Sequence, residues 1–260
     1  MTAPTPLPDR YELYERAAQS PERQAKFLRA LHPAPPGTSL VLGEDFCGAG
    51  ALSRAWTQVF PGAGAICIDH DPEPLARLRA LGAGDIKIIQ GDVRSADAPA
   101  DIIATLNFSI CELKRRSDLL DYLGAVRKRL RPDGLFVADL YGGVDAFAMG
   151  ESDLELRGGV RYIWEQREAD PLTGLVVNAM HFELPDGTRL EDAFVYHWRL
   201  WSAPELQEAM LEAGFDAVET HDRLGDAVDS EGRVYLRPVE SPDELDENFV
   251  IYLAARTPGG

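Results

Sequence analysis

The stretch that decides the fold of this chain reads Leu40-Val41-Leu42-Gly43-Glu44-Asp45-Phe46-Cys47-Gly48-Ala49-Gly50-Ala51-Leu52-Ser53. A short apolar run leads into two carboxylates, then a Gly-x-Gly turn, and then a segment rich in Ala and Leu. Glycines at a strand–helix junction let the backbone approach a ligand, and the helix N-terminus offers unpaired N–H groups. Nucleotide-type cofactors bind at such junctions in doubly wound sheets. Since Gly-x-Gly also occurs in turns without a ligand, the motif needs support from the rest of the chain.

That support comes from further strand-like runs at regular intervals, most of which end on an acid or an amide. They are Ala65–Asp69, Ile86–Asp92, Asp101–Asn107 and Gly134–Asp139, with helical segments expected near 51–59, 73–81, 95–98 and 117–130. Strands that alternate with helices predict a parallel sheet covered on both faces. Polar residues at the carboxyl ends of such strands lie where open α/β sheets bind ligands.

These motifs, in this order, resemble the class I S-adenosylmethionine-dependent methyltransferases over roughly residues 38–256. The first loop of that family reads acid-x-Gly-x-Gly-x-Gly. Glu44 takes the acidic position, Phe46 replaces the first glycine, and Gly48 and Gly50 match the other two. The resemblance implies an α/β fold with a Rossmann-like, seven-stranded, mostly parallel sheet and a reversed C-terminal strand. It also implies S-adenosylmethionine as cofactor and S-adenosylhomocysteine as product.

The resemblance also implies a set of cofactor contacts. The acid that holds the ribose hydroxyls matches Asp69, and the acid that faces the adenine amino group matches Asp92. The position between cofactor and substrate matches Asn107-Phe108-Ser109. The full set is Tyr14, Glu44, Phe46, Cys47, Gly48, Ala49, Gly50, Asp69, His70, Asp92, Val93, Asn107 and Phe108. Carboxylates are suitable acceptors for hydroxyl and amino donors, although Asp69 and Asp92 also suit solvated turns or helix caps.

The net charge and the cysteine content of the chain limit the classes of partner and metal that it is expected to bind. The 260 residues carry a formal net charge of −17, which argues against nucleic acid because its phosphates would be repelled. Cys47, Cys67 and Cys111 lie at no zinc-binding spacing and are expected to be reduced core residues, and no metal site is expected. With no visible signal peptide or transmembrane run, we expect a cytoplasmic protein that binds no membrane.

Residues 1–37 are expected to form a helical extension and linker, with helices at Arg10–Ala18 and Pro21–Leu31. Tyr11 and Tyr14 lie three residues apart and so share one helical face. This helix is interpreted either as a lid over the cofactor or as simple packing on the sheet.

Residues 150–200 interrupt the expected domain, which comprises 38–149 and 201–257. Strand-like runs at 159–167, 175–184 and 189–201, separated by turns, predict an inserted three-stranded antiparallel β-meander. Its aromatic faces suit a substrate cover, a dimer surface or packing against the main sheet. The substrate-binding candidates are Tyr141, Tyr162, Trp164, His197 and Arg199.

The predicted reaction is an in-line displacement of the sulfonium methyl group by an N, O or C nucleophile of a small molecule. Orientation in a dry pocket supplies part of the barrier, so that a strong base is optional. The catalytic candidates are His197, His181 and Asn107, and a base, if the reaction uses one, is expected at the two histidines or at the neighbours of Asn107. Two alternatives stay open: a NAD-dependent oxidoreductase, whose third motif glycine would be Ser53, and a catalytically silent cofactor-binding subunit. The chain is expected to be a monomer or a homodimer.

Overall fold

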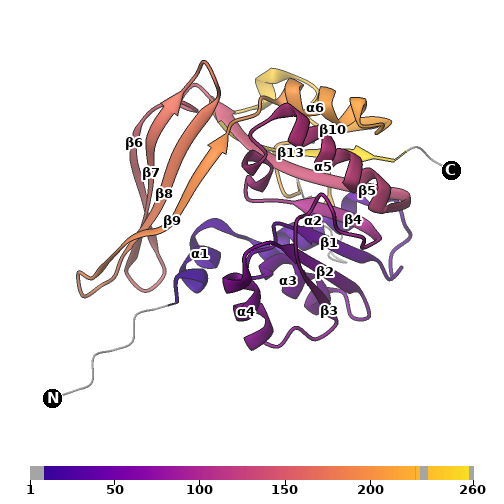
Figure 1. Ribbon diagram of the computed structural model, residues 1–260, viewed down its shortest axis with the longest axis horizontal. Helices are drawn as coiled ribbons and strands as arrows, with labels where there is room; N and C mark the ends of the chain where they lie inside the picture. The colour runs from indigo at the N-terminus through magenta and orange to yellow at the C-terminus, as the bar shows by residue number, and fades with distance from the viewer. Residues whose placement is uncertain (1–8, 226, 229–233, 258–260) are drawn as a thin grey trace.

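The computed structural model describes residues 9–225, 227–228 and 234–257, so residues 1–8 of the expected extension lie outside the described part. A seven-stranded sheet forms the centre of the molecule, in the order β10-β13-β5-β4-β1-β2-β3 (Figure 1). Its strands are β1 (Val41–Asp45), β2 (Gly64–Asp69), β3 (Ile86–Gln90), β4 (Ala100–Thr105), β5 (Leu130–Gly143), β10 (Ala217–His221) and β13 (Asn248–Arg256). The predicted fold class is confirmed.

The sheet is parallel except at one strand. β13 runs antiparallel to both of its neighbours, β5 and β10, and is therefore the reversed strand. The chain passes from β1 outward through β2 and β3 and then returns to place β4 on the other side of β1. The strand order thus reverses at β1 and β4, and ligands of open α/β sheets bind outside the carboxyl ends of the strands at this point.

Helices cover both faces of the sheet. They are α1 (Arg10–Ala18), α2 (Pro21–Leu31), α3 (Ala51–Val59), α4 (Pro72–Ala80), α5 (Arg116–Arg129) and α6 (Ala203–Glu212), with short 3₁₀ helices at Ser109–Glu112 and Pro242–Glu244. Buried side chains of α2, α3 and α4 form one apolar core with the sheet, and those of α5 and α6 form the other.

Capping side chains mark the start of three of the six α-helices, with Asp9 before α1, Asp71 before α4 and Ser202 before α6. Ser202 and Glu205 form a reciprocal capping box at the start of α6. Pro21 occupies the first turn of α2 as expected, but Ser20 makes no capping hydrogen bond with its side chain. The helix expected at 95–98 is wrong: a turn at 93–95, in which Ser95 N–H donates to Asp92 O at 3.0 Å, is followed by irregular chain. Four residues are too few to offset the unfavourable nucleation of a helix.

The insertion is a four-stranded sheet, not the expected three-stranded meander. Its strands are β6 (Gly150–Leu156), β7 (Val160–Asp170), β8 (Leu175–Glu183) and β9 (Arg189–Arg199), paired antiparallel in chain order. β6 was missed because six of its seven residues are exposed, so that the strand has no buried, alternating apolar face. A two-stranded ribbon of β11 (Ala227–Val228) and β12 (Val234–Tyr235) completes the sheets.

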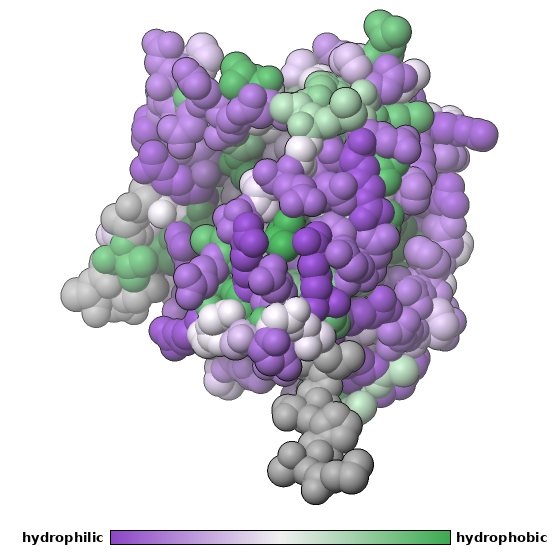
Figure 2. All heavy atoms as spheres, turned by 90° about the vertical axis from the view of Figure 1, so that its left-hand side faces the viewer, coloured by the Kyte–Doolittle hydropathy of each residue, from purple (hydrophilic) through white to green (hydrophobic). Residues whose placement is uncertain are grey.

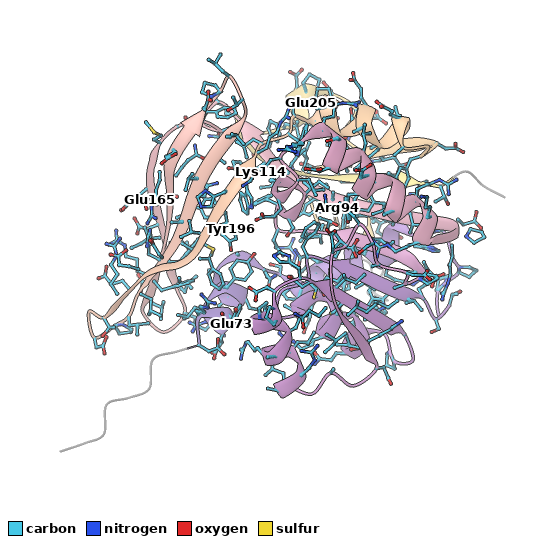
Figure 3. All side chains as sticks on the ribbon, viewed as in Figure 1. Glu73, Arg94, Lys114, Glu165, Tyr196 and Glu205 are labelled. Atoms are coloured by element: carbon cyan, nitrogen blue, oxygen red, sulfur yellow. The ribbon has the colours of Figure 1, made fainter. Side chains whose placement is uncertain are left out.

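The two faces of the four-stranded sheet differ in character. The outer face is mostly hydrophilic (Figure 2), and ion pairs such as Arg161–Asp153 and Arg189–Glu191 lie along it. The inner face is aromatic. Figure 3 shows Tyr196 between this sheet and the main body, whereas Glu165 lies on the far side. In the described ranges, no helix has both the length and the apolar character needed to cross a membrane.

Candidate active site

A cavity of about 510 Å³, here called the first cavity, lies at the carboxyl ends of β1, β2 and β4. The loop after β1, the start of α3, the loop after β2, α1 and the middle of β9 all contribute to its walls. Nine of the predicted cofactor-binding residues line it: Tyr14, Glu44, Phe46, Cys47, Gly48, Ala49, Asp69, His70 and Asn107.

The two motif glycines have different roles. Gly48 has a φ of 52°, and a Cβ atom placed there would meet no heavy atom within 4 Å, so its backbone borders open space. Gly50 has a φ of 65° and precedes α3, and its Cβ atom would lie 2.7 Å from Leu78 and 3.1 Å from Cys67. Gly50 therefore permits close packing of the helix on the core, and it does not line the first cavity.

Asp69 is fixed at the end of β2. Its Oδ2 accepts a hydrogen bond from Gly48 N–H at 2.8 Å, and its Oδ1 accepts one from Asp71 N–H at 2.9 Å. Two carboxylate oxygens carry about four lone-pair sites, so that Asp69 can still accept hydrogen bonds from a ligand. The hydrogen bond from Gly48 ties the loop after β1 to the end of β2.

Asp92 and Val93 occupy different surroundings from Asp69. The Asp92 carboxylate is exposed and pairs with the guanidinium of Arg94, whose hydrogen bonds lower the pKa of Asp92. Val93 is buried in the core formed with α5 and α6. Neither residue lines the first cavity.

The adjacent acids Glu44 and Asp45 are both buried. The Glu44 Oε2 accepts Ser53 N–H at 2.8 Å, and burial raises the pKa of Glu44 to about 7. Asp45 instead forms a buried ion pair with Arg129 and accepts a hydrogen bond from Tyr122 Oη at 2.8 Å. Because Asp45 already pairs with a cation of the protein, Glu44 is the one of the two acids that a cationic ligand would neutralise.

The turn after β4 is strained. Asn107 and Phe108 adopt φ values of 59° and 62°, in the left-handed region that residues other than Gly rarely occupy. Asp139 holds this turn from β5: its Oδ2 accepts Asn107 N–H at 2.9 Å and its Oδ1 accepts Phe108 N–H at 2.7 Å. Burial raises the pKa of Asp139 to about 7.

A second cavity of about 320 Å³ lies beyond this turn, between the seven-stranded and four-stranded sheets. It shares Tyr14, Asn107 and Tyr196 with the first cavity. The remaining lining residues are Ala18, Gln24, Phe108, Asp139, Tyr162, Trp164, Met180, Trp198, Val250 and Tyr252. The substrate candidates Tyr162 and Trp164 are therefore placed here. Tyr141 lines a neighbouring cavity of about 530 Å³, which shares Trp164 and Val250 with the second.

α1 forms one wall of the first cavity. Arg10 pairs with Glu73 at 2.6 Å, Glu15 with Arg54 at 2.5 Å, and Asp9 with Arg77, which ties α1 to α3 and α4. On its other side Leu13 is fully buried in an apolar cluster with the four-stranded sheet. Tyr11 and Tyr14 line the first cavity and Leu13 packs on the four-stranded sheet, and the lid interpretation of this helix stays a prediction.

His197 and Arg199 lie outside both cavities. His197 is exposed and borders a separate hollow beside Lys114 and Glu168. The Arg199 guanidinium stacks on Trp201 at 3.9 Å and donates to Lys114 O at 3.3 Å, which ties β9 to the core. From these positions neither side chain reaches a ligand in the first or second cavity.

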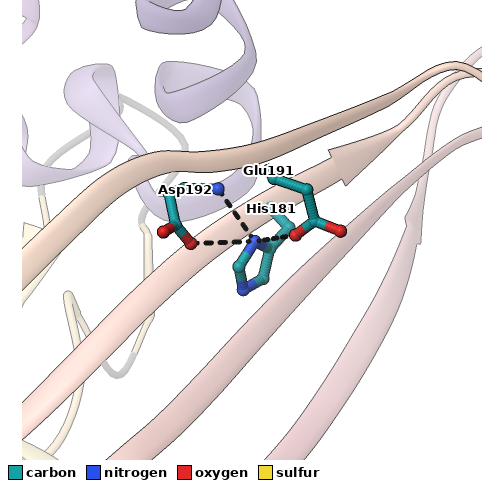
Figure 4. A group of neighbouring side chains, drawn as sticks. All are labelled: His181, Glu191 and Asp192. Atoms are coloured by element: carbon teal, nitrogen blue, oxygen red, sulfur yellow. Dashed lines mark hydrogen bonds and ion pairs between the residues drawn. The ribbon is translucent and has the colours of Figure 1, made fainter.

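His181 is also separated from the cavities. Figure 4 shows its ring between Glu191 and Asp192; its Nδ1 accepts Asp192 N–H at 3.0 Å, and its Nε2 lies 3.1 Å from Glu165. The His181 side chain is buried and lines neither the first nor the second cavity, so it does not contact a ligand there. Of the three catalytic candidates, the structure brings only Asn107 to the cavities.

Several lining residues were not among the predicted site residues, among them Asp139, Glu112 and Phe194. Asp139 ends the fifth strand-like run, but its position gave no sign that it holds the turn after β4. Glu112 accepts a hydrogen bond from Trp198 Nε1 at 2.8 Å, and Phe194 packs on Tyr14 with ring centroids 5.1 Å apart. Both contacts join segments far apart in the chain, so that only the alternation of aromatics in 189–201 pointed towards them.

Comparison with known proteins agrees with this geometry. No protein-family model matches the chain. The trans-aconitate 2-methyltransferase of Deinococcus radiodurans is 26% identical over 188 residues, which is 69% of this chain and 67% of that protein. An S-adenosylmethionine-dependent methyltransferase from Clostridium acetobutylicum superposes with a TM-score of 0.72 at 16% identity, over 96% of this chain and 98% of that one. CalS10, an amino pentose methyltransferase from Micromonospora echinaspora, gives a TM-score of 0.67 at 16% identity, over 98% and 100%. The chain thus has the fold of S-adenosylmethionine-dependent methyltransferases.

Proposed function

We propose that this chain is an S-adenosylmethionine-dependent methyltransferase whose acceptor is a small molecule. The observation that carries the proposal is that two cavities meet at Tyr14, Asn107 and Tyr196. One lies at the strand ends beside Gly48 and Asp69, and the other is walled by aromatic rings. This arrangement suits two ligands held end to end. The methyltransferase names of the relative and of the structural neighbours support the same conclusion.

The residues of the first cavity fit the proposed cofactor. The Asp69 carboxylate can accept ribose hydroxyls, and the open backbone at Gly48 allows a close approach. Glu44 is a buried acid that an ammonium group would hold in its charged form. The cofactor supplies an activated methyl group on a sulfonium, and S-adenosylhomocysteine is the product. Asp92 pairs with Arg94 outside the first cavity, and its assignment to the adenine stays a prediction.

The protein's contribution to the reaction is placement and exclusion of water. Asn107 and Phe108 hold the boundary between the cavities in a fixed conformation, because Asp139 accepts both of their N–H groups. Tyr14 and Tyr196 form the rest of that boundary. Fixed orientation of two reactants can remove about 7–11 kcal/mol from a barrier.

The alternatives have less support. In the nicotinamide motif the third glycine lets the helix pack closely on the strand, whereas Ser53 is fully buried here and donates its N–H to Glu44. A silent binding subunit has no use for a second, aromatic cavity. The absence of a nucleic-acid partner is proposed on the net charge of −17. The cytoplasmic location, the division of the chain into domains, and the choice between monomer and homodimer stay predictions. The charged outer face of the four-stranded sheet gives no support to a dimer there (Figure 2).

The proposal is tested by thermal unfolding and calorimetry with S-adenosylhomocysteine and with NAD. We expect saturable stabilisation by S-adenosylhomocysteine, which increases with the logarithm of its concentration, and none by NAD. Stabilisation by NAD alone would instead favour the oxidoreductase. Binding of S-adenosylhomocysteine without turnover of any member of a metabolite library would favour the silent subunit.

A further inference from the structure

The charges around the second cavity limit what can occupy it. Of the described residues that line it, Asp139 is the one acid, and none is Lys, Arg or His. The neighbouring cavity beneath Tyr141 is likewise lined by acids such as Asp145 and Glu151 and by no described cationic side chain. In the first cavity Arg10 is the one described Lys or Arg. It is committed to Glu73 at 2.6 Å and to Ala193 O at 3.1 Å.

We propose that the methyl acceptor is an amine, bound as an ammonium ion between the aromatic rings of the second cavity and the Asp139 carboxylate. This inference rests on the proposed methyltransferase function and adds the chemical class of its substrate. An anionic acceptor such as a carboxylate or a phosphate would have no described cation to pair with, and would face Asp139 at close range.

The aromatic rings supply the first element of ammonium recognition. The rings of Trp164, Tyr196 and Trp198 form one continuous array on the inner face: the Tyr196 and Trp198 centroids are 4.4 Å apart, and Trp164 lies 6.0 Å from Trp198. Phe108 meets Trp198 edge to face at 6.1 Å from the opposite side of the cavity. Cations bind over the faces of such rings, most strongly over Trp, and the attraction grows when water is excluded.

Asp139 supplies the second element. Each of its oxygens accepts one backbone N–H, which leaves further lone pairs free to accept from an ammonium donor. A positive charge nearby would favour its ionised form against the burial that raises its pKa to about 7. Asp139 also fixes the turn at Asn107, where the second cavity joins the first, so that an ammonium bound to it lies near the junction.

The same carboxylate can complete the proton balance. The ammonium passes one proton to Asp139, and the neutral nitrogen then holds a lone pair. That lone pair forms the new N–C bond while the methyl C–S bond breaks, and the electron pair of the C–S bond stays on sulfur as a thioether. The methylated nitrogen is again positively charged, and Asp139 returns its proton to solvent once the product leaves. No oxidant or further reactant is needed.

The test uses the full-length chain and sets of compounds built on several small aryl and cycloalkyl scaffolds. Each set contains the primary amine, the alcohol and the carboxylate of the same scaffold. In the presence of saturating S-adenosylhomocysteine, we expect at least one scaffold whose amine raises the unfolding temperature more than its two partners do. With S-adenosylmethionine, kcat/KM for that amine should exceed the values for its alcohol and carboxylate by about tenfold or more. Mass spectrometry should place the methyl group on nitrogen.

Two variants sharpen this test. Trp164→Phe keeps an aromatic face and should retain the preference for amines, whereas Trp164→Leu should reduce it about tenfold or more. Asp139→Asn should lower kcat/KM for the amine about tenfold or more, a larger factor than any loss of affinity for S-adenosylhomocysteine, because an amide neither pairs with an ammonium nor takes its proton; should that variant fail to fold, the Trp164 pair still decides.

The inference is overturned if alcohols or carboxylates are the better substrates. It is also overturned if no amine is distinguished from its partners on any scaffold, or if Trp164→Leu keeps the full preference. A chain that is not stabilised by S-adenosylhomocysteine would refute the proposed function itself, which is a separate outcome.

Discussion

The two sides of the site are built by different means. On the side of the seven-stranded sheet, backbone groups and carboxylates fix the loops. Gly48, Asn107 and Phe108 have positive φ values. Their N–H groups donate hydrogen bonds to Asp69, in the case of Gly48, and to Asp139, in the case of the other two. On the side of the four-stranded sheet, ring packing dominates, as between Tyr196 and Trp198. A wall built of backbone tolerates few substitutions, whereas a wall of side chains can be reshaped one residue at a time. The first side therefore suits a constant cofactor and the second a variable acceptor.

The largest effect is expected at Gly50, where the loop meets the core. Gly50→Val combines a φ of 65° with a Cβ atom 2.7 Å from Leu78, and should lower the free energy of unfolding by about 2–5 kcal/mol. Gly48→Ala has a similar φ but open space, and should lower it by about 1–2 kcal/mol. Urea denaturation of both variants measures the difference. Equal losses would show that packing at Gly50 is not limiting.

The second prediction compares Asp69 and Asp92, which follow neighbouring strands and were both predicted to bind the cofactor. Asp69→Ala should weaken S-adenosylhomocysteine binding by about 1–3 kcal/mol, because a carboxylate acceptor at the first cavity is lost. Asp92→Ala should leave the affinity within about threefold, since its carboxylate pairs with Arg94 outside that cavity. Isothermal titration calorimetry decides between them. A larger loss for the Asp92 variant would support its assignment to the adenine.

A third comparison concerns the two faces of the four-stranded sheet. Trp164→Ala should lower kcat/KM for the acceptor by about 10- to 30-fold while the affinity for S-adenosylhomocysteine stays normal, because the ring lines only the acceptor side. His197→Ala on the outer face should leave both quantities unchanged. Steady-state kinetics on the two variants tests the assignment, and a loss confined to His197→Ala would reverse it.

The smallest effect is a pH dependence. Burial raises the pKa of Glu44 to about 7, so that in the free protein the side chain is mostly protonated below that pH. The ammonium group of S-adenosylhomocysteine favours the ionised form of Glu44. The affinity of the protein for S-adenosylhomocysteine should therefore rise by up to about tenfold between pH 6 and pH 8. In Glu44→Gln this rise should disappear, as calorimetry at several pH values would show.

The same raised pKa fixes the sign of a stability effect. The pKa of Glu44 is higher in the folded chain than in the unfolded one, so the folded state holds the extra proton between the two values. The resulting stabilisation is fully present below the unfolded pKa and is lost as the pH rises through about 7. Glu44→Gln should flatten that decline in thermal unfolding. A steeper decline in the variant would contradict the assignment.

The sequence predicted strands β1 to β5 because each of these runs ends in a local signal, such as the Glu44–Gly50 run or the acid at Asp69, whereas the seven strands and the reversed strand were implied by the family resemblance. It predicted most of the first cavity for the same reason, since neighbouring parallel strands bring their carboxyl ends to one edge. It could not predict that Gly50 packs against Leu78 or that the Arg94 guanidinium pairs with the Asp92 carboxylate, because these contacts depend on packing and on side-chain conformation.

The second cavity was predictable only in part. The period-two spacing of Tyr162 and Trp164 placed both on one face, and that face lines the cavity. The same rule puts His197 and Arg199 on the face opposite Tyr196 and Trp198 of their own strand, but it does not say which face meets the main body. The bond from Asp139 to the turn at Asn107 joins residues 32 positions apart, beyond the reach of any local pattern.

The two attachments of α1 respond differently to ionic strength. Its ion pairs to α3 and α4 are partly exposed, with Arg10 and Glu73 at 37% and 60% side-chain exposure, so salt screens them. The burial of Leu13 against the four-stranded sheet is apolar and is not screened. Added salt should therefore loosen α1 from the main domain while it stays with the four-stranded sheet. The residence time of S-adenosylhomocysteine should shorten with salt, while the acceptor cavity keeps its shape.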